Sequence, residues 1–235
     1  MLLRYCTMFA LANQAFAPLD LRAALCYTVR MEQLCVIFGA GETYAPRKKF
    51  GASDLIIAAD GGYKTACDVG VEPSVVIGDF DSGEMPQNTA AHIIKLDRDK
   101  NDTDMIAAVK LGLRRGYRTF VLYGGTGGRL DHTVANFATL AYLNAFDAHG
   151  YLVGKDSVAT VITDEKFTLP KTARGTVSVF AYGGTASGVT LDGMSYKLQD
   201  AELSPDFPLG VSNATAKSNC SVSVKHGSLL IFFPR

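Results

Sequence analysis

Two pairs of aspartates have types and spacing that suit metal chemistry. Asp79 and Asp81 lie in Gly78-Asp79-Phe80-Asp81-Ser82, and side chains two positions apart in an extended loop project to the same side. Carboxylate oxygens, completed by water and substrate phosphates, are the usual ligands of Mg²⁺ in phosphoryl-transfer sites. A solvated turn is the plainer interpretation of this loop alone. Its position directly after the apolar run Val75-Val76-Ile77 favours a magnesium site.

The second pair lies in Asn101-Asp102-Thr103-Asp104, at the start of an amphipathic segment. Asp102 is predicted to cap a helix, and Asp104 in the first turn would complement the helix dipole. Asp104 also lies where it can add a third carboxylate to the metal site. We therefore predict Asp79, Asp81 and Asp104 as the metal-binding and catalytic carboxylates.

Two further loops are rich in glycine, namely Asp60-Gly61-Gly62 and the segment from Gly124 to His132. Glycines let main-chain amides approach phosphate oxygens, and a helix N-terminus favours an anion. Arg129 offers a rigid fork of donors that can neutralise phosphates. The second loop does not match the G-x-x-x-x-G-K-[ST] pattern, so it is not an ordinary P-loop. Capping for Asp131 and partial exposure for His132 are the plainer interpretations.

These loops need elements that bring them together. Alternation of strands and helices predicts an α/β domain over residues 31–156, with a parallel, Rossmann-like sheet. Ligands bind at the carboxyl ends of such strands, so the loops should converge there. The predicted strands are Leu34–Phe38, Leu55–Ala59, Ser74–Ile77 and Thr119–Tyr123, and the predicted helices are Tyr63–Val69, Asp104–Arg115 and Thr133–Phe146.

Residues 157–235 change in character and predict an all-β sandwich. Short alternating runs are separated by the turn signals Gly183-Gly184, Asp192-Gly193 and His226-Gly227. The last of these signals predicts a β-hairpin. The predicted runs are Val158–Ile162, Thr176–Tyr182, Val189–Leu191, Cys220–Lys225 and Ser228–Phe233.

Composition excludes several classes of protein. The 23 basic and 23 acidic residues give a formal net charge of zero, which argues against a nucleic-acid binder. Five scattered cysteines without a C-x-x-C pair indicate a reducing compartment, so we expect a cytoplasmic protein. The sequence lacks the run of about 20 apolar residues that a membrane helix needs. Residues 1–30 are predicted to be an extension outside the fold, with a secretory signal as the alternative.

The four loops resemble, in order and spacing, the signature loops of the thiamine pyrophosphokinase family. The likeness runs from about Met31 to Phe233 and includes Leu209-Gly210-Val211-Ser212-Asn213, which is similar to the family's thiamine-contacting segment. The resemblance implies a homodimer whose active sites form between the catalytic domain of one subunit and the β-domain of the other.

The resemblance also implies a reaction. The hydroxyl of thiamine would attack the β-phosphorus of ATP, giving thiamine diphosphate and AMP, with Mg²⁺ held by the three aspartates. Ser212 and Asn213 would bind thiamine, although the chain lacks the tryptophan that some members stack on it, and Phe207 or Phe232 is the candidate replacement. The implied ATP-binding residues are Asp60, Gly61, Gly62, Gly127, Gly128, Arg129 and Asp131.

Two alternatives remain open at this point. One is a nucleotide-binding sensor on the same scaffold without turnover, and the other is pyrophosphoryl transfer to another small alcohol. The general base is also open between Asp104 and Asp79.

Overall fold

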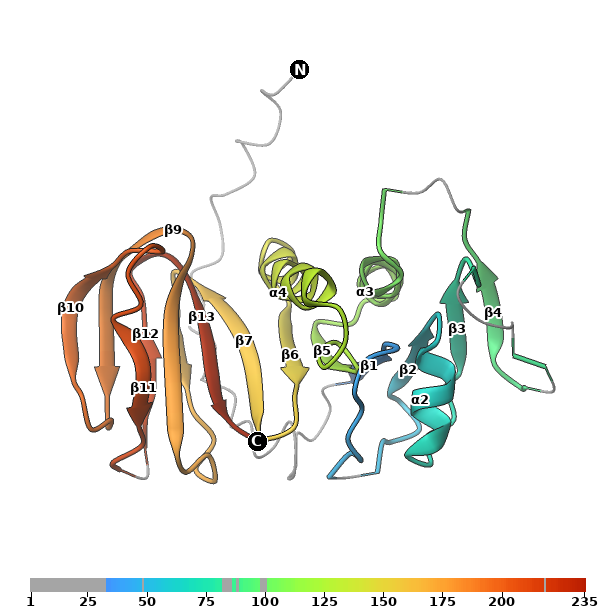
Figure 1. The fold of residues 1–235 in the computed structure, drawn as a ribbon, viewed down its shortest axis with the longest axis horizontal. Coiled ribbons are helices and arrows are strands. Elements are labelled where there is room, and N and C mark those ends of the chain that lie inside the picture. Colours follow the sequence, from blue (N-terminus) through green and yellow to red (C-terminus); the bar gives the residue numbers. More distant parts are fainter. Residues whose placement is uncertain (1–32, 48, 82–85, 88, 98–100, 218) are drawn as a thin grey trace, which may run out of the picture.

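A computed structural model describes residues 33–235, except 48, 82–85, 88, 98–100 and 218. The predicted extension (1–30) and Ser82 lie outside the described residues. In the described part, the strands form one mixed sheet with few helices (Figure 1). Its strand order is β4-β3-β2-β1-β5-β6-β7-β13-β9-β12-β8, with β10 and β11 each paired to β9.

The first half of this sheet is parallel. Neighbouring strands pair in parallel from β4 through to β6. The sequence analysis predicted four of these strands but not β4 and β6, whose apolar runs are very short and begin after His or Gly. The bounds are β1 Leu34–Phe38, β2 Leu55–Ala59, β3 Val75–Gly78, β4 His92–Lys95, β5 Thr119–Tyr123 and β6 His149–Val153.

Three helices flank the parallel half in the described part of the chain: α2 (Gly62–Asp68), α3 (Asp104–Arg114) and α4 (Leu130–Asn144). Helices α3 and α4 lie on one side of the sheet and α2 on the other (Figure 1). Strand β1 serves both faces because its side chains alternate. Cys35 and Ile37 pack with the α3 and α4 residues, whereas Val36 and Phe38 pack with Ala66 of α2.

The start of α3 differs from the prediction. Thr103, not Asp102, is the N-cap, and its hydroxyl accepts a hydrogen bond from Ile106 N at 3.3 Å. The prediction for Asp102 was wrong because the next residue also has a capping side chain, and Asp102 instead pairs with Lys110 at 2.7 Å. Asp104 is in the first turn, as expected.

The second half of the sheet is antiparallel and is joined to the first without a break. Strand β7 pairs antiparallel with β6, and β13 pairs with both β7 and β9. Strand β9 is long enough to belong to two layers, since it pairs with β11 and β13 in one and with β10 and β12 in the other. The bounds are β7 Ser157–Thr163, β8 Lys166–Thr168, β9 Thr176–Asp192, β10 Leu198–Leu203, β11 Gly210–Ala214, β12 Ser221–Ser223 and β13 His226–Pro234.

Two predictions for this half were wrong. Gly183-Gly184 is not a turn between strands, because β9 continues through it, with Gly183 at φ 75°. The hairpin across His226-Gly227 does not form either, because β12 pairs with β8 and β9 and lies in the other layer from β13. Asp192-Gly193 does end a strand.

The core continues across both halves. The two antiparallel layers enclose Val158, Ile162, Leu229 and Ile231 among other apolar residues. The neighbouring residues of β7 and β13 face the other way and pack with α4 side chains, as in the edge-on contact of Phe137 with Phe232 at 5.5 Å between ring centroids. None of the helices in the described part combines the length and apolar character that crossing a bilayer demands.

Candidate active site

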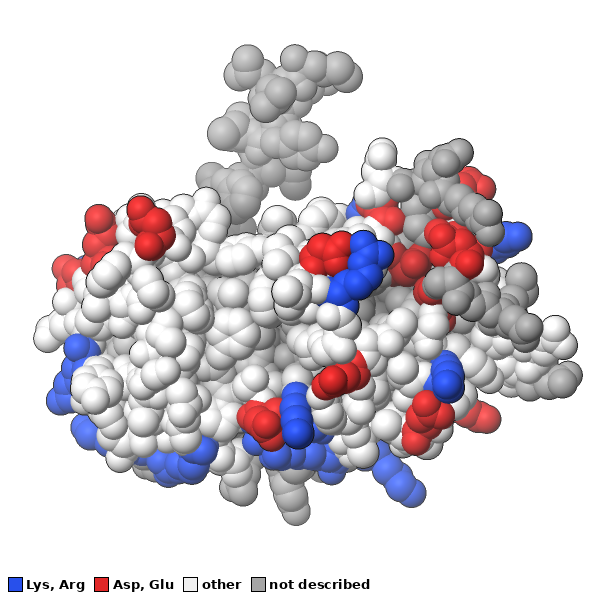
Figure 2. Space-filling view, viewed as in Figure 1, with Lys and Arg blue, Asp and Glu red and all other residues white. Residues whose placement is uncertain are grey.

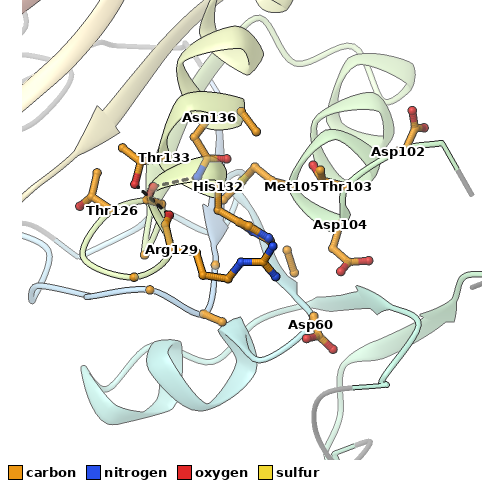
Figure 3. A pocket seen from close by; sticks show the side chains of 18 of the residues that line it. Asp60, Asp102, Thr103, Asp104, Met105, Thr126, Arg129, His132, Thr133 and Asn136 are labelled. Atoms are coloured by element: carbon orange, nitrogen blue, oxygen red, sulfur yellow. Dashed lines mark hydrogen bonds between the residues drawn. The ribbon is translucent and has the colours of Figure 1, made fainter.

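A cavity of about 650 Å³ lies at the carboxyl ends of the parallel strands. It is bordered by the loops after β1, β2, β3 and β5 and by the first turns of α3 and α4 (Figure 3). The loops converge as expected, since parallel strands bring their carboxyl ends to one edge.

Carboxylates line this cavity from three elements. The predicted residues Asp60, Asp79, Asp81 and Asp104 all contribute, together with Asp102. In Figure 3, Asp60 and Asp104 lie on one side of the cavity, facing Arg129, the residue before α4, and His132 in its first turn. In the space-filling view, acidic side chains gather over this part of the molecule, whereas the middle of the antiparallel half carries few charges (Figure 2).

The backbone is unusual where these carboxylates are presented. Asp60 and Phe80 have positive φ values of 48° and 57°, although neither is glycine. Such conformations cost about 1–3 kcal/mol each and persist where the surrounding structure imposes them, often at functional sites. Asp81 N also donates to Asp79 Oδ1 at 3.2 Å, so the carboxylate of Asp79 is held against the backbone of Asp81.

The carboxylates are not drawn together into a ready-made metal cage. In the described part of the chain, no group of three or more His, Cys, Asp or Glu side chains is arranged to hold a metal ion. An arrangement of dispersed carboxylates around one cavity fits Mg²⁺, which usually takes one or two carboxylates and completes its shell with water and substrate phosphates.

Arg129 is a cationic side chain that lines the same cavity. It precedes α4, and its guanidinium donates to both carboxylate oxygens of Asp131, at 2.6 and 3.2 Å. This hydrogen bonding lowers the pKa of Asp131, so the carboxylate is ionised at neutral pH. An anionic Asp131 would repel phosphate, so its contact with Arg129 indicates that it orients the guanidinium.

The glycines of the site fall into two kinds. Gly62 is buried, and a Cβ there would lie 1.8 Å from the carbonyl oxygen of Phe38, so it is glycine because α2 packs tightly on β1. Gly128 is exposed and lines the cavity, and a Cβ there would meet nothing within 4 Å. Only the second kind leaves main-chain amides open to a ligand. Gly61 and Gly127 lie beside Ala40 and Glu42 respectively and are absent from the lining.

Asn136 is a residue of the site that the sequence did not reveal. Its side chain is buried on α4 and donates to Gly125 O at 2.8 Å, which fixes the glycine-rich loop onto the helix (Figure 3). A single asparagine within a helical pattern carries no signal of such a role. The apolar residues around Asn136 predicted the helix, but they did not predict the hydrogen bond to Gly125 O.

Ser212 and Asn213 lie elsewhere, on β11. Ser212 is exposed with φ 58°, and its N–H donates to Ser178 Oγ at 3.1 Å. Asn213 is buried, and its amide bonds to the backbone N and O of Tyr196, at 2.9 and 2.6 Å. The described residues that line the cavity all precede residue 137, so one chain does not bring β11 to it.

Comparison with known proteins agrees with both halves of the chain. Residues 47–152 match the family description "Thiamin pyrophosphokinase, catalytic domain", and residues 165–229 match "Thiamin pyrophosphokinase, vitamin B1 binding domain". Together these matches cover more than half of the chain. A curated thiamine pyrophosphokinase of Bacillus subtilis is 24% identical over 185 residues, which is 75% of this chain and 86% of that protein.

Solved structures show the same fold. The thiamine pyrophosphokinase structure from Bacillus subtilis has a TM-score of 0.77 at 22% identity, covering 86% of this chain and 99% of that one. The protein from Geobacillus thermodenitrificans has a TM-score of 0.76 at 26% identity, covering 86% of this chain and 98% of that one. The yeast enzyme has a TM-score of 0.75 at 16% identity, covering 92% of this chain and 90% of that one. The chain belongs to the thiamine pyrophosphokinase family.

Proposed function

We propose that this chain transfers the pyrophosphoryl group of ATP to the hydroxyl of thiamine, giving thiamine diphosphate and AMP. The observation that carries the proposal is the cavity in which Asp79, Asp81 and Asp104 meet the open glycine loop and Arg129. A site with acidic metal ligands on one side and phosphate-binding donors on the other suits phosphoryl transfer, in which positioning and charge neutralisation supply most of the acceleration.

The proposal gives each of these residues a role. Asp79, Asp81 and Asp104 would hold Mg²⁺, which neutralises charge on the transferring phosphates when bound. Arg129, oriented by Asp131, would bind phosphate oxygens with its planar fork, and the amides around Gly128 would approach the phosphates closely. Asp60 would lie along the ATP phosphates. Asp79 or Asp104 would accept the proton of the attacking hydroxyl.

Thiamine would bind to the antiparallel half, over residues 157–235, whereas ATP would bind to the Rossmann-like half, over residues 31–156. Exposed Ser212 would hydrogen-bond the aminopyrimidine, and Asn213 would support it by holding the Tyr196 segment in place. Phe207 is 65% exposed and free to cover the thiamine ring. Phe232 is the weaker candidate because its ring packs edge-on against Phe137 and Phe180.

A homodimer would unite the two halves of the site. Apolar side chains are exposed in both of the regions that must meet, with Leu130 and Val134 on α4 and Phe207, Leu209 and Val211 near Ser212. Exposed apolar side chains near a functional region favour a protein interface. The described cysteines Cys35, Cys67 and Cys220 are free thiols, in keeping with a reducing, cytoplasmic location.

One assay tests the reaction. The protein is incubated with Mg²⁺, ATP and thiamine, and we expect AMP and thiamine diphosphate in equal amounts. ADP as the product would contradict pyrophosphoryl transfer. Saturable ATP binding without any product would identify a sensor, and product formed only with another alcohol would replace thiamine as the substrate.

Subunit complementation tests the shared site. Asp79→Asn and Ser212→Arg are each expected to be nearly inactive alone, because one removes a metal ligand and the other blocks the thiamine position. Co-expressed heterodimers should regain up to half of the activity per dimer, since one of their two sites combines an intact catalytic half with an intact β-half. No recovery in isolated heterodimers would show that each site lies within one chain.

A further inference from the structure

An ion pair beside the cavity ties a lining residue back to the body of α3. Lys110 Nζ donates to both carboxylate oxygens of Asp102, each at 2.7 Å. Asp102 precedes the helix and lines the cavity, whereas Lys110 lies in the second helical turn. The contact therefore fixes the incoming loop along the side of the helix.

The same lysine approaches the neighbouring helix. Its Nζ lies 6.0 Å from the centroid of the Tyr142 ring on α4. This distance is at the limit of cation–π attraction, so the ring adds a weak second partner for the ammonium group. The cation thus lies between the loop before α3 and α4, the helix whose N-cap Arg129 and first-turn residue His132 line the cavity (Figure 3).

The two residues directly before Asp104 are both held in place. The carboxylate of Asp102 is held by Lys110. Thr103 caps the helix through its side chain, and its carbonyl accepts from Ala107 N at 2.9 Å. We propose that Lys110 is a positioning residue that, by holding Asp102, sets the loop that presents Asp104 to the cavity.

The pairing also separates Asp102 from the other aspartates of the cavity. Both of its oxygens accept from one ammonium group, so its charge is neutralised within the protein. A metal ion bound to this carboxylate would lie close to the ammonium group of Lys110 and would be repelled by it. Asp102 is therefore assigned to the loop, and the metal is left to the carboxylates named above; this inference rests on the proposed function.

The expected effects on stability and on rate distinguish a positioning role for Lys110 from a purely stabilising one. Both side chains of the pair are 34% exposed, and partly exposed ion pairs contribute little to stability. In contrast, a displacement of about 1 Å in a catalytic group can lower a rate about a hundredfold. Loss of Lys110 should therefore lower turnover much more than it lowers the melting temperature.

The first test compares Lys110→Met with Lys110→Arg in the full chain, using Mg²⁺, ATP and thiamine. We expect kcat to fall at least about tenfold in Lys110→Met with KM for thiamine within about twofold, because thiamine binds elsewhere. Lys110→Arg keeps the charge pair and should retain most of the turnover. The matched control is Lys225→Met, which removes the Lys225–Asp200 pair, also at 2.7 Å but in the antiparallel half. Wild-type kcat in Lys110→Met would overturn the proposal.

A second test asks whether Asp102 and Lys110 act as a unit. If they do, the double variant Asp102→Asn/Lys110→Met should be no worse than the poorer single variant, since coupled residues are not additive. Magnesium titration of each variant distinguishes the alternative. A sharply raised magnesium requirement in Asp102→Asn but not in Lys110→Met would make Asp102 a metal ligand and would overturn the proposal.

A third test does not depend on turnover. Amide hydrogen exchange over Asp102–Ile106 should be at least about tenfold faster in Lys110→Met than in the unaltered chain, and unchanged in Lys225→Met. Unchanged exchange in Lys110→Met would contradict the positioning role, whatever the activity. Faster exchange together with no product from the unaltered chain would instead contradict the proposed function alone.

Discussion

The two halves of the sheet end their strands in different ways. In the parallel half, the loops after β1, β2, β3 and β5 carry glycine or aspartate and meet around one cavity. In the antiparallel half, polar side chains are used to fix turns, as when Asp164 accepts from Gly227 N at 2.7 Å. Exposed apolar side chains occur in both halves, for example Leu130 on α4 and Phe207 in the antiparallel half. The comparison indicates that the loops of the parallel half bring carboxylates together around a cavity, whereas the polar side chains of the antiparallel half also hold its own turns.

The largest expected effect comes from removing a charge in the parallel half. Asp79→Asn or Asp81→Asn should lower kcat at least about a hundredfold, because oriented charge around transferring phosphates is usually the largest catalytic term. The measurement is AMP release with Mg²⁺, ATP and thiamine, and the thermal melt should show an intact fold. Asp68→Asn, at the exposed end of α2, is the matched control and should keep its activity. Near-normal turnover in either variant would show that the metal assignment is wrong.

A smaller and more selective effect is expected in the antiparallel half. Ser212→Ala should raise KM for thiamine about tenfold through the loss of one hydrogen bond, while KM for ATP stays the same. Steady-state kinetics with each substrate varied in turn measures both constants. Ser195→Ala, at another exposed serine, is the control. Equal changes in the KM values for thiamine and ATP would contradict the proposal that the two substrates bind to different halves.

The two kinds of glycine give a further contrast within the parallel half. Gly62→Ala should lower the free energy of unfolding by about 3 kcal/mol, because its Cβ would collide with backbone. Gly128→Ala should leave the stability almost unchanged but lower turnover about tenfold, because its Cβ would enter the space where phosphate oxygens approach. Denaturant unfolding and turnover are measured on both. The reverse pattern would mean that Gly128 is structural.

The smallest effect is one of pH on stability. Burial raises the pKa of Glu165 above its ordinary value of 4.5, and the nearby His149 only partly offsets this. The folded state therefore binds this proton more tightly than the unfolded state, so stability is lost as pH rises above about 4.5. Glu165→Gln should raise the melting temperature by a few degrees at pH 7, and the difference should shrink toward pH 4.

The control for this last prediction is Glu202→Gln, at an exposed position on β10. It should show no such pH-dependent gain. A lower melting temperature for Glu165→Gln at pH 7 would instead mean that the ion pair with His149 outweighs the cost of burial.

Local patterns predicted the parallel half better than the antiparallel half. Strands β1, β2 and β5 are apolar runs buried on both faces, so their bounds follow from composition alone. The pairing of β13 with β7 and β9 depends on residues far apart in sequence, and a glycine turn signal between neighbouring runs suggested the wrong partner. The pairing partner of a strand therefore cannot be predicted from a short window of sequence when the partner lies far away in the chain.

The candidate site divides in a similar way. The aspartates of the cavity could be predicted because each follows a recognisable strand or opens a helix. The partners of Asp102 and Asn136 could not, since a lysine eight residues away and a carbonyl on another loop are set by the folded backbone. The N-cap of α3 could not be predicted either, because Asp102 and Thr103 are both suitable capping residues and only the folded backbone selects Thr103.

The antiparallel pairing of β6 with β7 has a consequence for how substrates enter. A two-domain enzyme often closes over its substrates by turning on a flexible linker, but here the hydrogen-bonded ladder runs from one half straight into the other. Turning the halves as rigid bodies would break that ladder and expose the core beneath α4. We therefore do not expect the two halves of one chain to close over the substrates by turning on a hinge.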